Sequence, residues 1–320
     1  MKLLGIDTSN YTTSCAWLDT DSGQVIQQKQ LLPVPEGQAG LRQSDAVFHH
    51  TRQFPSLFEK LTAEAGIGVR PDAVGVSVTP RDADGSYMPC FLAGRGAARI
   101  LSSAYAIRLH ETSHQMGHIL AALYSAHCLN WLSKGAAPFL AFHVSGGTTD
   151  CLLCTPDEEK VMQIVLHSSS LDLKAGQAVD RVGLMLGLQF PCGAALEQLA
   201  VQSKTNKAMR ITLKKGSCSL SGLQNQCASM QSKGTSPQDI ARYCLNSIGA
   251  AISAMTMDAV RGLGEMKVIY AGGVLSDRLI QQQLQKLPIQ TAFAQPQFSC
   301  DNAVGTAVYA ARMEGWEWES

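Results

Sequence analysis

Two stretches of the chain share one pattern of apolar and small polar positions. Residues 4–18 (LGIDTSNYTTSCAWL) and 140–154 (LAFHVSGGTTDCLLC) each read as an apolar strand, a Ser/Gly/Thr turn and a second apolar strand. Four residue pairs, 136 positions apart, are identical: Ser9 with Ser145, Thr12 with Thr148, Thr13 with Thr149 and Cys15 with Cys151. The pattern predicts two β-hairpins whose turns expose backbone N–H groups, which suit phosphate. One hairpin in each half indicates two related lobes.

The rest of the first half predicts a meander followed by alternating helices and strands. The expected elements are strands at 3–7, 14–18, 25–32 and 72–78, helices at 44–65 and 90–106, and loops at 33–44 and 80–89. Ser44 is the expected N-cap of its helix, and Pro55 predicts a kink or break.

The second half repeats this order. It predicts strands at 139–144, 149–155, 161–167 and 267–270, and helices at 175–187, 193–203, 237–263, from Ser276 onward and at 302–313. Three strands followed by alternating helices and strands, occurring twice, resemble a duplicated ribonuclease-H-like α/β fold. This is the plan of the actin, sugar kinase and Hsp70 ATPase superfamily, with two lobes and a central nucleotide cleft. We expect one lobe from residues 1–110 plus 302–320 and the other from 111–301.

Composition narrows the class of protein. A chain of 320 residues with 45% hydrophobic and 16% charged residues is globular and suits two domains. The net charge of zero argues against a surface coated with positive charge for nucleic acid, but leaves a local basic patch or a partner open. The chain shows neither an 18-residue apolar run nor a signal peptide, so we expect a soluble, cytoplasmic protein without membrane contact. Most of the ten cysteines lie within apolar strand or helix patterns, where they pack as small hydrophobic residues. This pattern, which we take to include Cys151 and Cys154, is typical of reduced cysteines rather than of disulfides.

Two histidines at helical spacing are candidates for a metal site. The segment TSHQMGHILAAL places His114 and His118 on one face of a helix, with Thr112 or Ser113 as its cap. The alternative is a pair of partly exposed helix histidines. His110 precedes the cap and is interpreted as structural. Asp301 stands at the expected start of the last helix, where it can cap that helix or supply an oxygen ligand.

Two glycine-rich turns and one buried acid suggest nucleotide binding. VSGGTTD at 144–150 contains Gly146 and Gly147, which permit unusual backbone conformations and close approach of a ligand. AGGVLSDR at 271–278 offers Gly272 and Gly273 between a strand and a helix. Asp180 interrupts an apolar helix, where it can bind ribose hydroxyls or form a salt bridge with Arg181 or Lys174.

Nine motifs in order resemble the TsaD/Gcp family, long labelled O-sialoglycoprotein endopeptidases. They are GIDTS (5–9), GLRQSDAVFHH (40–50), SHQMGH (113–118), VSGGTT (144–149), AGQAVDRVGLMLGL (175–188), FPCGAAL (190–196), CSLSGLQ (218–224), AGGVLSDR (271–278) and CDNAVGTAVYA (300–310). The resemblance implies transfer of a threonylcarbamoyl group from an AMP adduct to adenosine 37 of tRNA, with metal assistance and without a side-chain nucleophile. It also implies ATP or threonylcarbamoyl-AMP as ligand, TsaB-like and TsaE-like partner subunits, and a homodimer or heterodimer.

The resemblance also assigns residues. It implies His114, His118 and Asp301 as ligands of one divalent metal, iron or zinc. It further implies a set of nucleotide-binding residues: Asp7, Ser145, Gly146, Gly147, Thr148, Asp180, Gly193, Gly272, Gly273 and Asp277. Gly193 corresponds to the glycine beneath the nucleoside, and Asp277 stands where the family usually has an asparagine at the adenine edge.

Several positions depart from the family pattern. The first hairpin reads SNYTT where the family has SCDET, so Tyr11 and Thr12 replace two acids. Thr148 replaces the histidine of VSGGHT, TPRDADGS (79–86) replaces a nearly uncharged GPGL loop, and Cys192 interrupts a PGG motif. These changes suggest a divergent paralogue. They leave two alternatives open: carbamoyl or acyl transfer to another acceptor, and a non-catalytic nucleotide-binding protein. Proteolysis is disfavoured because Gln115 occupies the glutamate position of an HExxH motif.

Overall fold

The computed structural model describes residues 1–9, 11–33, 41–66 and 68–317. Asn10 of the first turn and residues 34–40 of the predicted loop lie outside the described residues. The chain groups into two units: residues 1–136, 156–163 and 300–320 form unit 1, and residues 137–155 and 164–299 form unit 2. Unit 1 therefore continues past the expected boundary at residue 110, because the strand and helix that follow it pack with the same sheet.

Unit 1 is built on a five-stranded sheet in the order β3-β2-β1-β4-β5. Its strands are β1 (Lys2–Asp7), β2 (Thr12–Asp19), β3 (Gln24–Leu31), β4 (Ala73–Thr79) and β5 (Arg108–Ser113). β1 pairs antiparallel with β2 and parallel with β4, and β5 extends the parallel part. The sequence pattern missed β5, whose residues RLHETS are mostly polar and only partly buried.

Unit 2 contains a second sheet of the same order, β10-β9-β6-β7-β8. Its strands are β6 (Phe139–Val144), β7 (Thr149–Asp157), β8 (Val161–Ser169), β9 (Val268–Ala271) and β10 (Thr291–Phe293). β6 pairs antiparallel with β7 and parallel with β9, as β1 does with β2 and β4. The two predicted hairpins and the predicted duplication are thus confirmed.

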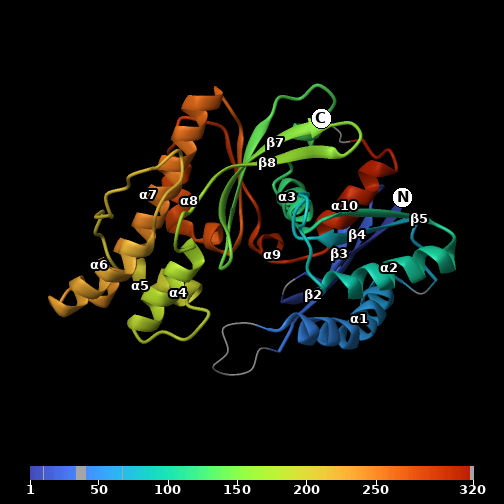
Figure 1. Cartoon of the computed structure of the whole chain (residues 1–320), viewed down its shortest axis with the longest axis horizontal. Coiled ribbons are helices and arrows are strands. Elements are labelled where there is room, and N and C mark those ends of the chain that lie inside the picture. The colour runs from blue at the N-terminus through green and yellow to red at the C-terminus, as the bar shows by residue number, and fades with distance from the viewer. Residues whose placement is uncertain (10, 34–40, 67, 318–320) are drawn as a thin grey trace. The chain divides into compact units, whose positions relative to one another are not determined.

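The two faces of the unit 1 sheet carry different helices, and residue alternation explains why. Leu4 and Ile6 point to one face, where α1 (Gln43–Ala65) and α2 (Phe91–Tyr105) cover them. On the other face, α10 (Val304–Met313) lies directly on the strands because these carry glycine (Figure 1). A Cβ atom on Gly5 would lie 2.2 Å from the Ala303 carbonyl oxygen.

Helix α1 differs in detail from its prediction. It begins at Gln43 with Arg42 in the cap position, so the predicted N-cap role of Ser44 is wrong. The Ser44 hydroxyl instead contacts Asp45. Pro55 lies inside a helix that continues on both sides of it.

Unit 2 places its helices around one apolar core. They are α4 (Ala175–Met185), α5 (Gly193–Ala200), α6 (Ser221–Ser232), α7 (Pro237–Leu263), α8 (Arg278–Leu284) and α9 (Pro296–Ser299). Ser236 caps α7 by accepting a hydrogen bond from the backbone N–H of Asp239, which fixes the predicted start of this helix. Side chains of α7 such as Ile248 and Ile252 share a core with Phe142 and Tyr270 of the sheet. Among the described residues, none of the helices has the length and apolar character needed to span a membrane.

Candidate metal site and nucleotide-binding residues

The start of α3 (His114–Ser125) is fixed by capping and by a close helix contact. The Ser113 hydroxyl accepts a hydrogen bond from the backbone N–H of Met116, which confirms the predicted cap. Farther along α3, Gly117 meets Gly305 of α10, where a Cβ atom on Gly305 would lie 1.7 Å from the Gly117 carbonyl oxygen. Only a glycine allows this approach. The contact brings the first turn of α3 next to the segment that precedes α10.

His114, His118 and Asp301 converge at this contact. The Nε2 atoms of the two histidines lie 2.8 Å apart, and Asp301 Oδ1 lies 3.6 Å from Nε2 of His114 and 3.3 Å from Nε2 of His118. Asp301 does not cap α10, because Asn302 Oδ1 accepts the hydrogen bond from the Val304 N–H. The alternative of a pair of partly exposed helix histidines holds for His114 but not for His118, which is buried, and both rings face the Asp301 carboxylate.

A second carboxylate, that of Asp7, contacts the Nδ1 side of the His114 ring. Asp7 ends β1 and is buried, and its Oδ1 lies 3.3 Å from Nδ1 of His114. The hydroxyls of Ser9 and Ser77 donate hydrogen bonds to the same carboxylate. An acceptor at Nδ1 fixes the tautomer that leaves Nε2 free to bind a metal. Sequence reasoning missed Ser77, which reaches Asp7 only because β4 pairs with β1.

The charges of this cluster are strongly coupled. Burial disfavours the imidazolium of His114, but the Asp7 and Asp301 carboxylates outweigh burial and raise the pKa of His114 to about 10. Burial and the neighbouring His114 charge lower the pKa of His118. The pKa of Asp301 lies well below its ordinary value because both histidines outweigh its burial. Two carboxylates therefore favour positive charge at the His114 ring, and a bound cation would supply such charge.

The donor set fits a divalent transition metal. One ligand atom from each of His114, His118 and Asp301 lies within 4.8 Å of the others. Two imidazole nitrogens and one carboxylate oxygen suit zinc or iron and leave coordination positions for substrate. Within the described part of the chain this is the one group of three such residues. His110 instead bonds through Nε2 to Glu314 Oε1 at 2.6 Å, in agreement with its predicted structural role.

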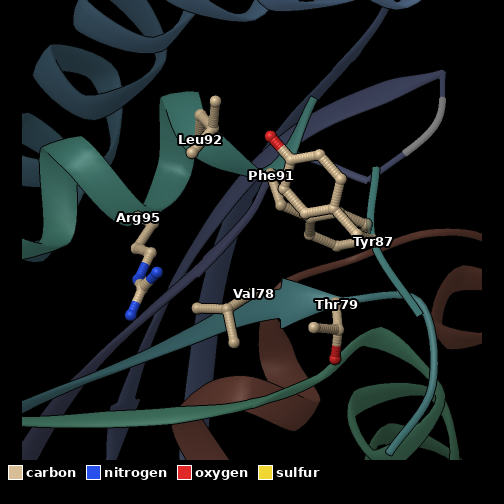
Figure 2. Close-up of a pocket in the computed structure, with 6 residues that line it drawn as sticks. All are labelled: Val78, Thr79, Tyr87, Phe91, Leu92 and Arg95. Atoms are coloured by element: carbon tan, nitrogen blue, oxygen red, sulfur yellow. The ribbon is translucent and has the colours of Figure 1, made fainter. Parts of the chain in front are cut away.

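Unit 1 contains a hollow of about 250 Å³, whose lining residues are drawn in Figure 2. Its lining combines the end of β4, the following loop and α2: Val78, Thr79, Tyr87, Phe91, Leu92 and Arg95. The Phe91 ring also lies edge-on to His114, with centroids 6.3 Å apart. Thr79 is the first residue of the loop TPRDADGS, which differs from the family pattern, and Tyr87 follows its last residue, so both ends of this loop border the hollow. Sequence analysis gave no signal for Phe91.

In unit 2, the turn between β6 and β7 is closed by its own side chains. Ser145 Oγ lies 2.8 Å from Thr148 Oγ1, and the Ser145 N–H donates to the Thr148 carbonyl. Gly146 and Gly147 permit unusual backbone conformations, but neither has a positive φ. Both are exposed and a Cβ atom on either would meet open space, so their backbone is accessible to a ligand.

Asp180 links α4 to the start of α5. Its Oδ1 accepts a hydrogen bond from the backbone N–H of Cys192 at 3.0 Å, and burial raises its pKa. Among the described ion pairs Asp180 has none with Arg181 or Lys174, so the salt-bridge alternative is wrong. Gly193 begins α5 and is exposed, with space beside its Cα. Ribose binding by Asp180 stays a prediction.

The second glycine pair begins a short 3₁₀ helix, η2 (Gly273–Ser276). Gly272 has a φ of 104°, and a Cβ atom there would lie 2.2 Å from the Val144 carbonyl oxygen, so this position requires glycine. Asp277 caps α8 by accepting hydrogen bonds from the backbone N–H groups of Leu279 and Ile280. Burial, with help from Glu197, raises the pKa of Asp277 to about 6. Its role at an adenine edge stays a prediction.

Solved structures share this fold. HypF in its phosphate- and nucleotide-bound form matches with a TM-score of 0.61 and 14% identity, covering 100% of this chain and 47% of HypF. Component A of the (R)-2-hydroxyglutaryl-CoA dehydratase of Acidaminococcus fermentans matches with a TM-score of 0.54 and 16% identity, over 98% and 99% of the two chains. A ROK-family glucokinase from Streptomyces griseus matches with a TM-score of 0.55 and 10% identity, covering 96% of this chain and 98% of the glucokinase. The protein therefore has the α/β fold of the actin, sugar kinase and Hsp70 ATPase superfamily.

Sequence comparison identifies the family. The family model TsaD, described as tRNA N6-adenosine threonylcarbamoyltransferase, matches residues 25–308. A protein of the same description from Thermofilum pendens is 25% identical over 292 residues, which are 90% of this chain and 80% of the relative. This chain belongs to the TsaD family.

Proposed function

We propose that this protein transfers a threonylcarbamoyl group from threonylcarbamoyl-AMP to adenosine 37 of tRNA. The observation that carries the proposal is the His114, His118 and Asp301 cluster, with Asp7 bonded behind His114, in a chain of the TsaD family. A scaffold protein has no need for three converging metal ligands and a buried carboxylate that orients one of them.

Two separate groups of residues bind the metal and the phosphate in this proposal. His114, His118 and Asp301 hold the metal, which when bound stabilises negative charge on the phosphate or carbamoyl oxygens. Ser145, Gly146, Gly147 and Thr148 offer hydroxyl and backbone N–H groups to phosphate. The adenine amine of the tRNA attacks the carbamoyl carbon and AMP leaves, so the reaction needs no nucleophile from the protein.

Asp180, Gly193, Gly272, Gly273 and Asp277 complete the proposal as nucleoside-binding residues of unit 2. The exposure of Gly193 and the raised pKa of Asp180 support a polar ligand near the start of α5. The pKa of Asp277, about 6, supports a neutral Asp277 below that pH, which donates a hydrogen bond as an asparagine does. We further propose iron or zinc as the metal, TsaB-like and TsaE-like partner subunits, and a cytoplasmic location.

The test is nucleoside analysis by mass spectrometry. The full-length protein is incubated with metal, unmodified tRNA and threonylcarbamoyl-AMP, with and without the partner subunits of the family. We expect threonylcarbamoyladenosine from the native protein and at least tenfold less from His118→Ala. A matched control is His49→Ala, which changes a histidine of α1. Absence of product with all partners present, while the adduct binds, would overturn the proposal.

One set of observations favours a second function, transfer to a different acceptor. Tyr11 and Thr12 replace two acids of the family pattern, and the loop between Thr79 and Tyr87 borders the hollow near Phe91 and His114. A changed rim changes which acceptor can approach. Release of AMP from the adduct without modified tRNA, in the presence of small amines or protein extracts, would support this alternative.

A further inference from the structure

One segment of unit 2 concentrates positive charge in a chain whose net charge is zero. Between Glu197 and Asp239 the sequence contains no acid and six cations: Lys204, Lys207, Arg210, Lys214, Lys215 and Lys233. Five of them lie within residues 204–215, which connect α5 to α6 mostly without regular secondary structure. We call residues 204–215 the basic segment.

The basic segment is held on the surface of α7. Asn246 donates from its Nδ2 to the carbonyl oxygens of Thr205 and Lys207, at 3.2 and 3.1 Å. The backbone N–H of Met209 donates to the Ser247 hydroxyl at 2.8 Å. Asn246 and Ser247 are themselves buried polar residues of α7. Three hydrogen bonds from one helix therefore fix the path of this extended chain.

Alternation then separates apolar from charged side chains. Met209, Ile211 and Leu213 pack against the unit 2 core, whereas Arg210, Thr212 and Lys214 are exposed. Successive side chains of an extended chain point to opposite sides, so Arg210 and Lys214 share the outer side, and Lys215 follows in an exposed turn. Extended chain rises about 3.3 Å per residue, so an extended path from Lys204 to Lys214 would span at most about 33 Å.

Among the described residues the cations of the basic segment form no ion pair, although the charge of Lys207 helps to lower the pKa of Asp239. Lys204, Lys207, Arg210, Lys214 and Lys215 are all exposed. The nearby carboxylate of Asp239 accepts a hydrogen bond from Ser203 and sits at the first turn of α7. A row of unpaired cations this long fits a polyanion rather than a single ion.

A hollow of about 350 Å³ beside the basic segment favours a single-stranded nucleic acid over a lipid surface. Lys207 lines it together with Gln226 and Met230 of α6 and with Asp239 and Tyr243 of α7. Tyr243 is half-buried, and its hydroxyl donates to the Gln226 side-chain oxygen. Unpaired RNA bases stack on aromatic rings and bond to amide groups, whereas a lipid surface uses neither.

We infer that the basic segment is a docking surface for the phosphate backbone of RNA, with the Tyr243 hollow beside it for an unstacked base. The inference deepens the proposed function, since tRNA is the proposed acceptor. It explains how a chain of zero net charge can bind RNA without partner subunits supplying all of the positive charge.

The test compares two full-length variants that each lose four charges. The first carries Lys207→Gln, Arg210→Gln, Lys214→Gln and Lys215→Gln. The matched control carries Lys60→Gln, Arg99→Gln, Lys160→Gln and Lys286→Gln, also three lysines and one arginine, all exposed. Fluorescence anisotropy measures the Kd for a labelled tRNA transcript across a salt series of about 50 to 200 mM.

We expect the first variant to bind tRNA at least tenfold more weakly at low salt, with a slope of log Kd against log salt reduced by roughly one for each lost phosphate contact. The control variant should keep native affinity and slope. Equal affinity of both variants would overturn the inference, as would loss of binding to anionic lipid vesicles with tRNA binding unchanged.

A modification assay separates this inference from the proposed function. If the native protein forms threonylcarbamoyladenosine, the first variant should raise the KM for tRNA and leave kcat at saturating tRNA unchanged. Salt-dependent tRNA binding that the first variant loses, in a native protein that forms no modified nucleoside, supports the docking surface while the proposed function fails. A native KM in the first variant overturns the docking surface while the proposed function stands.

Discussion

Asp7 Oδ1 lies 3.3 Å from Nδ1 of His114, while Nε2 of the same ring lies 3.6 Å from Asp301 Oδ1. One imidazole thus bridges a buried carboxylate and a candidate ligand carboxylate. The bridge defines which nitrogen of His114 binds a metal.

Asp7→Asn should therefore weaken metal binding by about 10- to 100-fold, because the orienting charge behind His114 is lost while the three ligands remain. Isothermal titration with Zn²⁺ on the metal-free protein measures the effect. Asp45→Asn, an exposed acid in the first turn of α1, is the control and should bind as the native protein does. Native affinity in Asp7→Asn would show that Asp7 has only a structural role.

Loss of the ligands themselves should have a larger effect. His114→Ala together with His118→Ala removes both nitrogen donors, and we expect metal content after purification to fall at least about tenfold. Elemental analysis of native protein, the double variant and His49→Ala gives the comparison, with circular dichroism to show that each is folded. A double variant with the native metal content would contradict the assignment of this site.

The contact between α3 and α10 offers two glycines with opposite predicted responses. Gly305→Ala places a Cβ atom 1.7 Å from the Gly117 carbonyl oxygen, and relieving that clash should cost about 3 kcal/mol or more. Gly117→Ala places its Cβ no closer than 3.6 Å to the Thr306 side chain, and should be neutral or stabilise by up to about 1 kcal/mol through helix propensity. Thermal unfolding measures both. Equal midpoints would show that the helices do not approach as described.

Gly305→Ala should also weaken metal binding, because the clash separates His118 from Asp301. Titration of the folded variant with Zn²⁺ tests this coupling. Gly117→Ala, which keeps the approach of the two helices, should bind with native affinity.

Asp277 predicts a pH dependence of stability. Its pKa in the folded protein is about 6 and its ordinary value is 3.8, so the folded state binds this proton more tightly. The stabilisation is present below about pH 4, declines as pH rises and is lost above about pH 6. The difference between these two pKa values corresponds to about 3 kcal/mol in the free energy of unfolding. Asp277→Asn keeps a capping oxygen but has no charge to bury, so its Tm should exceed that of the native protein at pH 7 and converge with it near pH 4.

Asp239→Asn is a control of opposite sign for this measurement. Hydrogen bonds from Ser203 and Ser236 lower the pKa of Asp239, so its contribution to stability is present at neutral pH and is lost on acidification. The variant should therefore be slightly less stable than the native protein at pH 7. A Tm difference between Asp277→Asn and the native protein that does not vary with pH would exclude Asp277 as the titrating group.

The sequence by itself determined the repeated framework. The apolar strands around Ser/Gly/Thr turns and the 136-residue repeat predicted both hairpins, and a long helix was predicted at 237–263, where α7 lies. These features depend on local periodicity and capping, which short stretches of sequence contain. The sequence analysis missed β5 and α6 because their residues are mostly polar and show little apolar periodicity.

Only the tertiary structure decided what the polar residues do. Asp301 had two local interpretations, and its approach to His118 across 183 positions of sequence excluded capping. Asp180 found a backbone partner at Cys192 rather than the adjacent Arg181. Ser77 and Phe91 joined the His114 cluster through sheet pairing and helix packing. Such contacts depend on which elements pack together, and the periodicity of a single element does not contain that information.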